Sequence, residues 1–236
     1  MKKIVKKIQK FLFNTEVGIV FWVFIGVVIL FFFLKTRKPT PYIFAILGPP
    51  ILFYIKKQDW LPYIYGGIIL ALLLQFIFSI VLSTNLPAVV IVSGSMDHGI
   101  TSTYPCHKMV SSYKESFDSW WDLCGESYSS FNITKEVFSN FPFRNGIKAG
   151  DIAIVKGLKT YEVGDIIVYN AGQAAPIIHR IVKINDGGTY QTKGDHNPGQ
   201  NPYEIRVTPE QIEGKVIFLI PRIGYPKVLV VRIIGV

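Results

Sequence analysis

Residues 88–96 read Ala-Val-Val-Ile-Val-Ser-Gly-Ser-Met, an apolar run that ends in small polar residues. Five consecutive apolar residues, four of them β-branched, predict a strand. The serine and glycine residues that follow predict a turn at the end of that strand. Ser95 lies where a nucleophile could be presented, although small residues after a strand form a plain turn more often. Because a nucleophilic serine needs a base that is oriented by a third group, the remaining sequence has to supply both.

The charge of the chain is unevenly distributed. Its 236 residues are 50% hydrophobic and carry a formal net charge of +9. Residues 1–84 contain ten basic and two acidic residues, whereas residues 85–236 contain 15 basic and 14 acidic ones. A nucleic-acid-binding protein would keep its positive charge on a folded domain, so nucleic acid is not expected as a partner. The basic residues instead flank hydrophobic segments, as at the cytoplasmic ends of membrane spans.

Residues 1–84 are predicted to form a membrane region with two or three transmembrane helices. The segments 17–34 and 60–82 have 18 and 23 residues without a charge, enough to cross a hydrocarbon core about 30 Å thick. The segment 42–55 is shorter and contains Gly-Pro-Pro, which leaves a kinked span and a re-entrant segment as alternatives. Five lysines before residue 17 place the N-terminus in the cytoplasm, and three spans then place residues 85–236 on the extracytoplasmic side.

Residues 85–236 are predicted to form a mostly β domain. Short β-branched runs alternate there with turns rich in Gly, Asp and Asn, a pattern typical of a β-sheet or barrel. Besides 88–92, the expected strands are 152–155, 166–169, 177–184, 189–193 and 214–220, with a short helical segment at 208–212. The last eleven residues, 226–236, are apolar but too short for a span, so they are expected to be a final strand or a stretch at the membrane interface.

Residues 97–148 are an insertion in the β domain without a sustained hydrophobic period. Its length favours a small fold of its own or a cover over a cleft, with a surface elaboration that has no role in chemistry as the alternative. It contains both cysteines, Cys106 and Cys124, which would form a disulfide in an oxidising compartment and are otherwise two buried thiols. The histidine spacing fits no metal site, so no metal is expected. The triplet Asn132-Ile133-Thr134 matches a glycosylation sequon, although so short a triplet also arises by chance.

His179 is the one histidine of four that lies inside a β run. A histidine in a strand is more often structural than catalytic, but the predicted hairpin gives it a partner. If residues 186–188 form a three-residue loop, His179 lies opposite Asp195 on the same face of the sheet; a two-residue loop would place Asp195 on the other face. In the first register, the carboxylate could accept one imidazole N–H and leave the other nitrogen free to take a proton from a serine.

Five short motifs occur in the order seen in type I signal peptidases. They are Ser93-Gly94-Ser95-Met96, Gly150-Asp151-Ile152, Gly164-Asp165-Ile166-Ile167-Val168-Tyr169, Ile178-His179-Arg180-Ile181-Val182 and Thr192-Lys193-Gly194-Asp195-His196-Asn197. The chain therefore resembles the archaeal and endoplasmic-reticulum type of this family, in which a histidine is the base. The resemblance covers about residues 88–96 and 148–225.

The resemblance implies that Ser95 is the nucleophile, that His179 is the general base and that Asp195 matches the first aspartate of the family. It also implies that the hydroxyl of Ser93 helps to bind the oxyanion. The family's second aspartate, six residues further on, is replaced by Asn201. Asn201 could orient the histidine through a neutral hydrogen bond, or Asp195 could take over that role. After the Ser-Gly-Ser-Met motif, the family usually has an acid and a proline, whereas this chain continues into the insertion.

Taken together, the residues and the resemblance predict a membrane-anchored protein whose N-terminal transmembrane helices precede a signal-peptidase-like catalytic domain. The expected activity is that of a serine endopeptidase that removes N-terminal signal peptides from exported proteins, without a cofactor. The expected partners are preproteins and the lipid bilayer, with the protein translocation machinery as a further candidate. A second hypothesis, motivated by Asn201, is a catalytically weak or inactive relative that acts as a membrane assembly or chaperone subunit.

Overall fold

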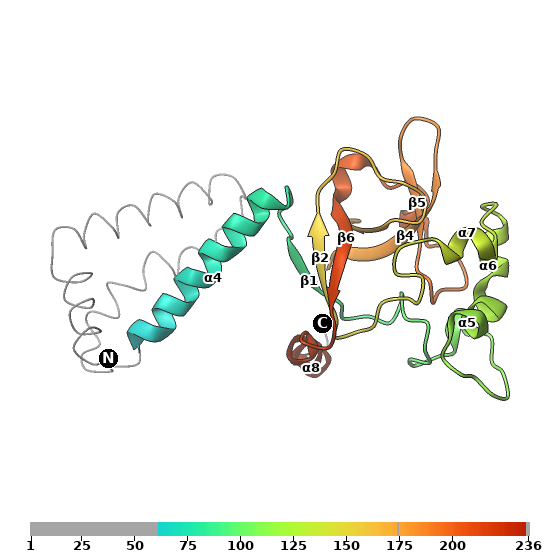
Figure 1. The fold of residues 1–236 in the computed structure, drawn as a ribbon, viewed down its shortest axis with the longest axis horizontal. Coiled ribbons are helices and arrows are strands. Elements are labelled where there is room, and N and C mark those ends of the chain that lie inside the picture. Colours follow the sequence, from blue (N-terminus) through green and yellow to red (C-terminus); the bar gives the residue numbers. More distant parts are fainter. Residues whose placement is uncertain (1–60, 174, 235–236) are drawn as a thin grey trace. The chain divides into compact units, whose positions relative to one another are not determined.

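The computed structural model describes residues 61–173 and 175–234, and Figure 1 shows its elements with the labels used below. The chain divides into two compact units, Met1–Leu73 and Leu74–Val236. The predicted spans at 17–34 and 42–55 lie outside the described residues.

Helix α4 (Leu61–Val81) occupies the segment that was expected to form the last span. It contains no charged residue. In the part of the chain that the structure describes, none of the helices combines the length and the apolar character needed to cross a membrane. The prediction for 60–82 is therefore confirmed as a helix, and a span is not found there.

Six strands form one antiparallel sheet, which confirms the expected β domain and each of its strands to within about two residues. The strands follow the order β1-β2-β6-β3-β4-β5, so the last strand of the chain lies in the middle of the sheet. They are β1 (Ala88–Val90), β2 (Ile152–Lys156), β3 (Ile166–Tyr169), β4 (Ile177–Ile184), β5 (Tyr190–Lys193) and β6 (Ile212–Ile220).

Both faces of the sheet are packed, and β3 shows why its sequence lacks the usual alternation of apolar and polar residues. Ile166 and Val168 lie in one apolar cluster, whereas Ile167 and Tyr169 lie in another. All four residues of this strand are buried. Burial on both faces favours the uninterrupted apolar run that the sequence has there.

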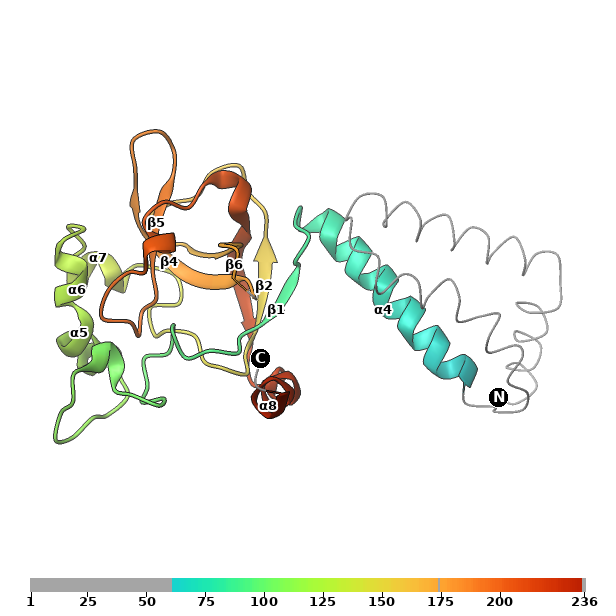
Figure 2. The same ribbon diagram turned by 180° about the vertical axis from the view of Figure 1, so that it is seen from behind.

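The insertion has a fold of its own. Its helices are η1 (Pro105–His107), α5 (Phe117–Cys124), α6 (Glu126–Ser129) and α7 (Lys135–Ser139). Figure 2 shows α5, α6 and α7 together on one side of the domain. Trp120, Tyr128 and Phe138 are fully buried in an aromatic core that also receives Val182 from β4. Helices α5, α6 and α7 have four to eight residues, too few to produce a readable hydrophobic period.

Cys106 and Cys124 form a disulfide with a Cα–Cα distance of 5.5 Å. The bond links η1 to the end of α5 across the insertion. The expected pairing is thereby confirmed.

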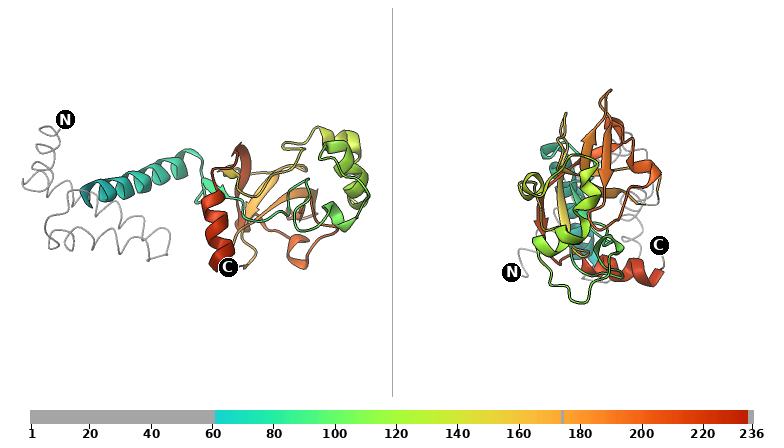
Figure 3. Two further views of the ribbon diagram at one scale, coloured as in Figure 1. Left: turned by 90° about the horizontal axis from the view of Figure 1, so that it is seen from below. Right: turned by 90° about the vertical axis from the view of Figure 1, so that its right-hand side faces the viewer.

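The C-terminal segment forms a helix, α8 (Tyr225–Ile234), so the expectation of a final strand is wrong. Pro226 lies in the first turn of this helix, where a missing N–H costs nothing. The helix is fastened to the domain at two points, because the Gly224 N–H donates to the Gly150 carbonyl at 2.8 Å and Val228 is buried. Figure 3 shows α8 from below and from the side.

Candidate active site

Ser95 and His179 meet although they are 84 positions apart in the chain. The Oγ atom of Ser95 lies 3.0 Å from Nε2 of His179. His179 is buried on β4, where it pairs with Ile167 of β3, whereas Ser95 is partly buried in the turn after β1. A strand in the sheet therefore presents the imidazole to a hydroxyl that remains accessible from outside.

The turn that carries Ser95 is held on several sides. The Asp97 N–H donates to the Gly94 carbonyl at 3.0 Å, and the Ser95 carbonyl accepts the His196 N–H at 2.8 Å. The next side chain, Met96, is buried in the core. Gly94 is required by close packing, because a Cβ there would lie 2.7 Å from the Thr101 methyl group. These contacts fix the backbone on both sides of the hydroxyl.

Glu204 completes a chain of three groups, and the sequence interpretation had not included it. Its Oε1 atom lies 2.5 Å from Nδ1 of His179, and the carboxylate is fully buried. Burial would raise the pKa of Glu204, but the hydrogen bond and charge of His179 and the two donors of Asn201 hold this pKa below its ordinary value. Glu204 is therefore ionised at neutral pH and can accept the Nδ1–H, which leaves Nε2 as an acceptor for the Ser95 hydroxyl.

Asn201 acts on the carboxylate and not on the histidine. Its backbone N–H and its Nδ2 donate to Oε2 of Glu204 at 2.6 and 2.8 Å. The two residues form a capping box at the 3₁₀-helix η2 (Pro202–Glu204), in which the third helical residue reaches back to the cap. The expected contact between Asn201 and His179 is thus replaced by an indirect one. The sequence Asn-Pro-Tyr-Glu contains this signal, since an Asn cap, a following proline and a Glu at the third helical position are typical of such a box.

The expected contact between Asp195 and His179 is absent, because the hairpin register changes part-way. The three-residue loop forms as predicted, and Ile184 pairs with Tyr190. A bulge between Ile181 and Lys183 then shifts the pairing by one residue. Beyond the bulge, each residue of β4 therefore lies opposite a residue of β5 that is one position away from the predicted partner, and that residue points to the other face of the sheet.

Gly194, rather than Asp195, therefore comes next to the imidazole. A Cβ at position 194 would lie 2.8 Å from Nε2 of His179 and 2.9 Å from the Ser95 carbonyl. The absence of a side chain at Gly194 leaves room for both catalytic candidates to approach each other.

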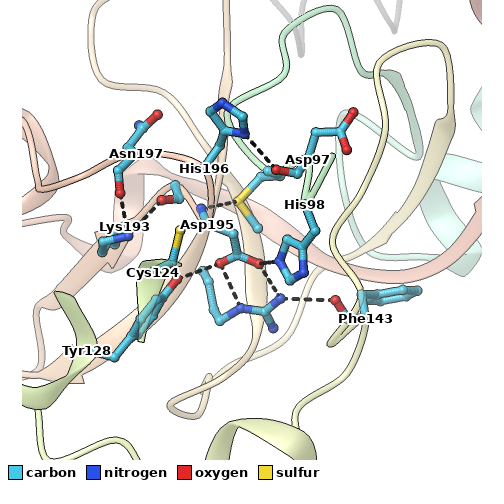
Figure 4. A network of polar contacts seen from close by, with 12 residues as sticks. Asp97, His98, Cys124, Tyr128, Phe143, Lys193, Asp195, His196 and Asn197 are labelled. Atoms are coloured by element: carbon cyan, nitrogen blue, oxygen red, sulfur yellow. Dashed lines mark hydrogen bonds and ion pairs between the residues drawn. The ribbon is translucent and has the colours of Figure 1, made fainter. Parts of the chain in front are cut away.

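Asp195 lies in a buried network that ties the insertion to β4 (Figure 4). Arg180 donates to both of its oxygens, at 3.0 and 2.7 Å, the Tyr128 hydroxyl donates at 2.9 Å and Nε2 of His98 lies 3.1 Å away. Burial would raise the pKa of Asp195, but the charge of Arg180 and the hydrogen bonds from His98 and Arg180 hold this pKa well below its ordinary value. Asp195 is thus a buried anion with four donors around it, and its geometry is that of a structural residue.

The insertion also touches the turn that follows β5. The Cys106 N–H donates to the His196 carbonyl at 2.8 Å, and the His196 N–H donates in turn to the Ser95 carbonyl. The ring of His196 lies 3.2 Å from the Thr103 hydroxyl. Residues 194–197 are therefore held between the disulfide-linked insertion and the turn of Ser95.

Ser93 lies beside the candidate nucleophile. Its Oγ atom is 3.2 Å from Oγ of Ser95, and the side chain is exposed. Within the described part of the chain, the backbone N–H of Ser95 donates to no acceptor. A hydroxyl and a free N–H are therefore available next to Oγ of Ser95, which is the kind of donor pair that can stabilise an oxyanion.

Comparisons with protein-family models and with curated proteins find no match for this sequence. The functional argument depends on the geometry of Ser95, His179 and Glu204 and on the motifs that surround them.

Proposed function

We propose that this protein is a membrane-bound serine endopeptidase of the signal peptidase I type, which removes N-terminal signal peptides from exported proteins. One observation carries the proposal: Ser95 Oγ, His179 and Glu204 form a continuous hydrogen-bonded chain with distances of 3.0 and 2.5 Å. A serine, a histidine and a carboxylate in this order are the groups that activate a hydroxyl for acyl transfer.

In the proposed mechanism, Ser95 Oγ attacks the carbonyl carbon of the scissile peptide bond while His179 Nε2 takes its proton. Glu204 keeps the ring in the required tautomer and stabilises the imidazolium that forms. The imidazolium gives the proton to the leaving amine, and His179 then activates a water molecule that hydrolyses the acyl-enzyme. The Ser95 N–H and the Ser93 hydroxyl would stabilise the oxyanion, where one such donor typically contributes about 10²–10³ in rate.

The substrate is proposed to bind as an extended strand beside β1. This strand comes first in the order of the sheet and leads directly to the turn of Ser95. The outer edge of a terminal strand offers unpaired backbone groups, to which an extended peptide can add. Such binding would place a peptide bond of the substrate next to the hydroxyl of Ser95.

The proposed location is the cell membrane, with residues 1–84 as a multi-pass anchor and residues 85–236 as an extracytoplasmic domain. The anchor is proposed from the uncharged apolar segments of the sequence and not from α4, where no span is found. The Cys106–Cys124 disulfide supports an oxidising compartment for the domain. Preproteins and the bilayer are the proposed partners, and the translocation machinery is a further candidate. The alternative role as an inactive assembly subunit is motivated by the lack of a carboxylate at position 201. The carboxylate of Glu204, which lies against His179 Nδ1, supports the active enzyme instead.

The test is cleavage of a preprotein by the full-length protein in proteoliposomes. Ser95→Ala and His179→Ala should each lower the rate at least about 10³-fold, and a fluorophosphonate probe should label the wild type but not Ser95→Ala. Ser130→Ala and His107→Asn change an exposed serine and an exposed histidine of the insertion and should leave the rate unchanged. Cleavage that persists in both catalytic-site variants would refute the assignment, and a folded wild type that neither cleaves nor takes up the probe would favour the assembly subunit.

A further inference from the structure

The proposed catalytic groups do not account for Asn132-Ile133-Thr134, which is the one Asn-X-Ser/Thr triplet of the whole chain. It connects α6 to α7 on the side of the domain away from β1 (Figure 1). None of the hydrogen bonds of Ser95 or His179 involves this loop. The triplet is therefore remote from the proposed chemistry and calls for a separate explanation.

The loop conformation exposes the two polar residues of the triplet and buries the apolar one. Asn132 is exposed and has a left-handed backbone, with φ of 57°. Its side chain has no hydrogen-bond partner within the described residues, so the carboxamide is free. Thr134 is also exposed, whereas Ile133 is buried at 5% exposure in the aromatic core of the insertion. The left-handed backbone favours an asparagine at position 132, and it leaves the carboxamide exposed and without a partner among the described residues.

Thr134 has a structural role that explains the threonine alone. Its Oγ1 accepts the Val137 N–H at 3.3 Å and caps the N-terminus of α7. Ser, Asp and Asn perform this capping about as well as Thr. The cap therefore accounts for a polar residue at position 134 and the left-handed backbone for an asparagine at position 132, but neither role uses the free carboxamide of Asn132.

We propose that Asn132 is an acceptor site for an N-linked glycan. The proposal depends on the extracytoplasmic placement proposed above, because glycans of this kind are added to translocated chains. The Cys106–Cys124 disulfide in the same insertion agrees with such a compartment. On the exposed α6–α7 loop, the glycan would cover and solubilise the insertion.

The co-substrate is an oligosaccharide linked to a lipid phosphate or diphosphate. The Nδ2 atom of Asn132 attacks the anomeric carbon of the first sugar, so that a C–N bond forms and the C–O bond to the phosphate breaks. The electron pair of that bond leaves with the lipid phosphate. One proton of the carboxamide passes to a base of the transferase, which balances the transfer.

The test is translation of the full chain in the presence of glycosylating microsomes, with the glycan detected as a mobility shift that peptide:N-glycosidase reverses. Wild type and Thr134→Ser should carry one glycan. Asn132→Asp should carry none, and it tolerates the left-handed backbone. Thr134→Asp should also carry none, although aspartate preserves the helix cap, so a loss there separates the sequon from the fold of the loop.

A second acceptor distinguishes failure of the site from failure of the placement. Leu158→Asn in the Asn132→Asp background creates the triplet Asn-Lys-Thr at 158–160, whose residues are exposed between β2 and β3. A glycan at 158–160 together with none on the wild type would overturn the site and keep the extracytoplasmic placement. No glycan on either protein would overturn the placement and, with it, the inference.

Discussion

Glu204→Gln is the substitution that most directly tests how the active site is arranged. Two donors of Asn201 point at one side of the Glu204 carboxylate, at 2.6 and 2.8 Å. The oxygen of a glutamine amide would turn towards these donors, so that its NH₂ group would face His179 Nδ1. The ring would then have to accept at Nδ1 and carry its proton on Nε2, and it could no longer take the proton of Ser95.

The expected loss in kcat is about 10³- to 10⁴-fold. The carboxylate and the imidazolium are both buried, and two unit charges about 4 Å apart interact by about 4 kcal/mol at an effective dielectric constant of about 20. Each 1.36 kcal/mol corresponds to a factor of about ten in rate, so the lost charge accounts for about 10³. The wrong tautomer adds to this, in line with the loss of about 10⁴ that the corresponding substitution causes in serine proteases.

Preprotein cleavage gives the rate, and ¹⁵N NMR of labelled histidine gives the tautomer of His179. The wild type should show the proton on Nδ1 and Glu204→Gln should show it on Nε2. Glu210→Gln is the matched control, because Glu210 is exposed on the neighbouring 3₁₀-helix η3 (Pro209–Gln211). A kcat for Glu204→Gln within about tenfold of the wild type, or an unchanged tautomer, would refute the role given to Glu204.

Asn201→Asp should lower activity, because it replaces a donor to Glu204 with a second negative charge. The repulsion should raise the pKa of the carboxylate pair, so that the acid limb of the pH profile of kcat/KM moves to higher pH. A gain in rate would contradict this. The double variant Cys106→Ser/Cys124→Ser should lose about 3 kcal/mol of unfolding free energy, because the bond closes a loop with a sequence separation of 18; in thermal melts, a reductant should destabilise the wild type and not this variant. Asp195→Asn should lower the free energy of unfolding by about 3–5 kcal/mol at pH 7, because the guanidinium of Arg180 would then be buried without a counter-charge. The pKa of Asp195 is lower in the folded state than in the unfolded one, so the unfolded state binds more protons in acid and wild-type stability falls as the pH drops below about 4. Urea denaturation at several pH values should show a weaker acid dependence for Asp195→Asn, and parallel profiles would exclude this explanation.

Local patterns were enough to predict the strands and the two residues, Ser95 and His179, that the structure brings within hydrogen-bond distance. The β-branched runs predicted all six strands, because burial on one or both faces of a sheet selects such residues wherever they occur in the chain. Ser95 and His179 were predicted from the short motifs that contain them and from the resemblance of those motifs to a known family. The even number of cysteines in one segment left a disulfide and two buried thiols as alternatives, and the structure shows the disulfide.

The third group of the site depended on tertiary packing, because the local Asn-Pro-Tyr-Glu pattern predicts the capping box of Glu204 but not its contact with His179. A single bulge between Ile181 and Lys183 moves Asp195 away from His179. Whether a strand contains such a bulge depends on the residues that pack against it. Here the neighbouring Val182 is buried in the core of the insertion. Glu204, 25 residues beyond His179, comes into reach through its capping box. Which carboxylate serves the histidine was therefore settled by packing between distant segments, because the two-residue period of a strand turns one extra residue into a different neighbour.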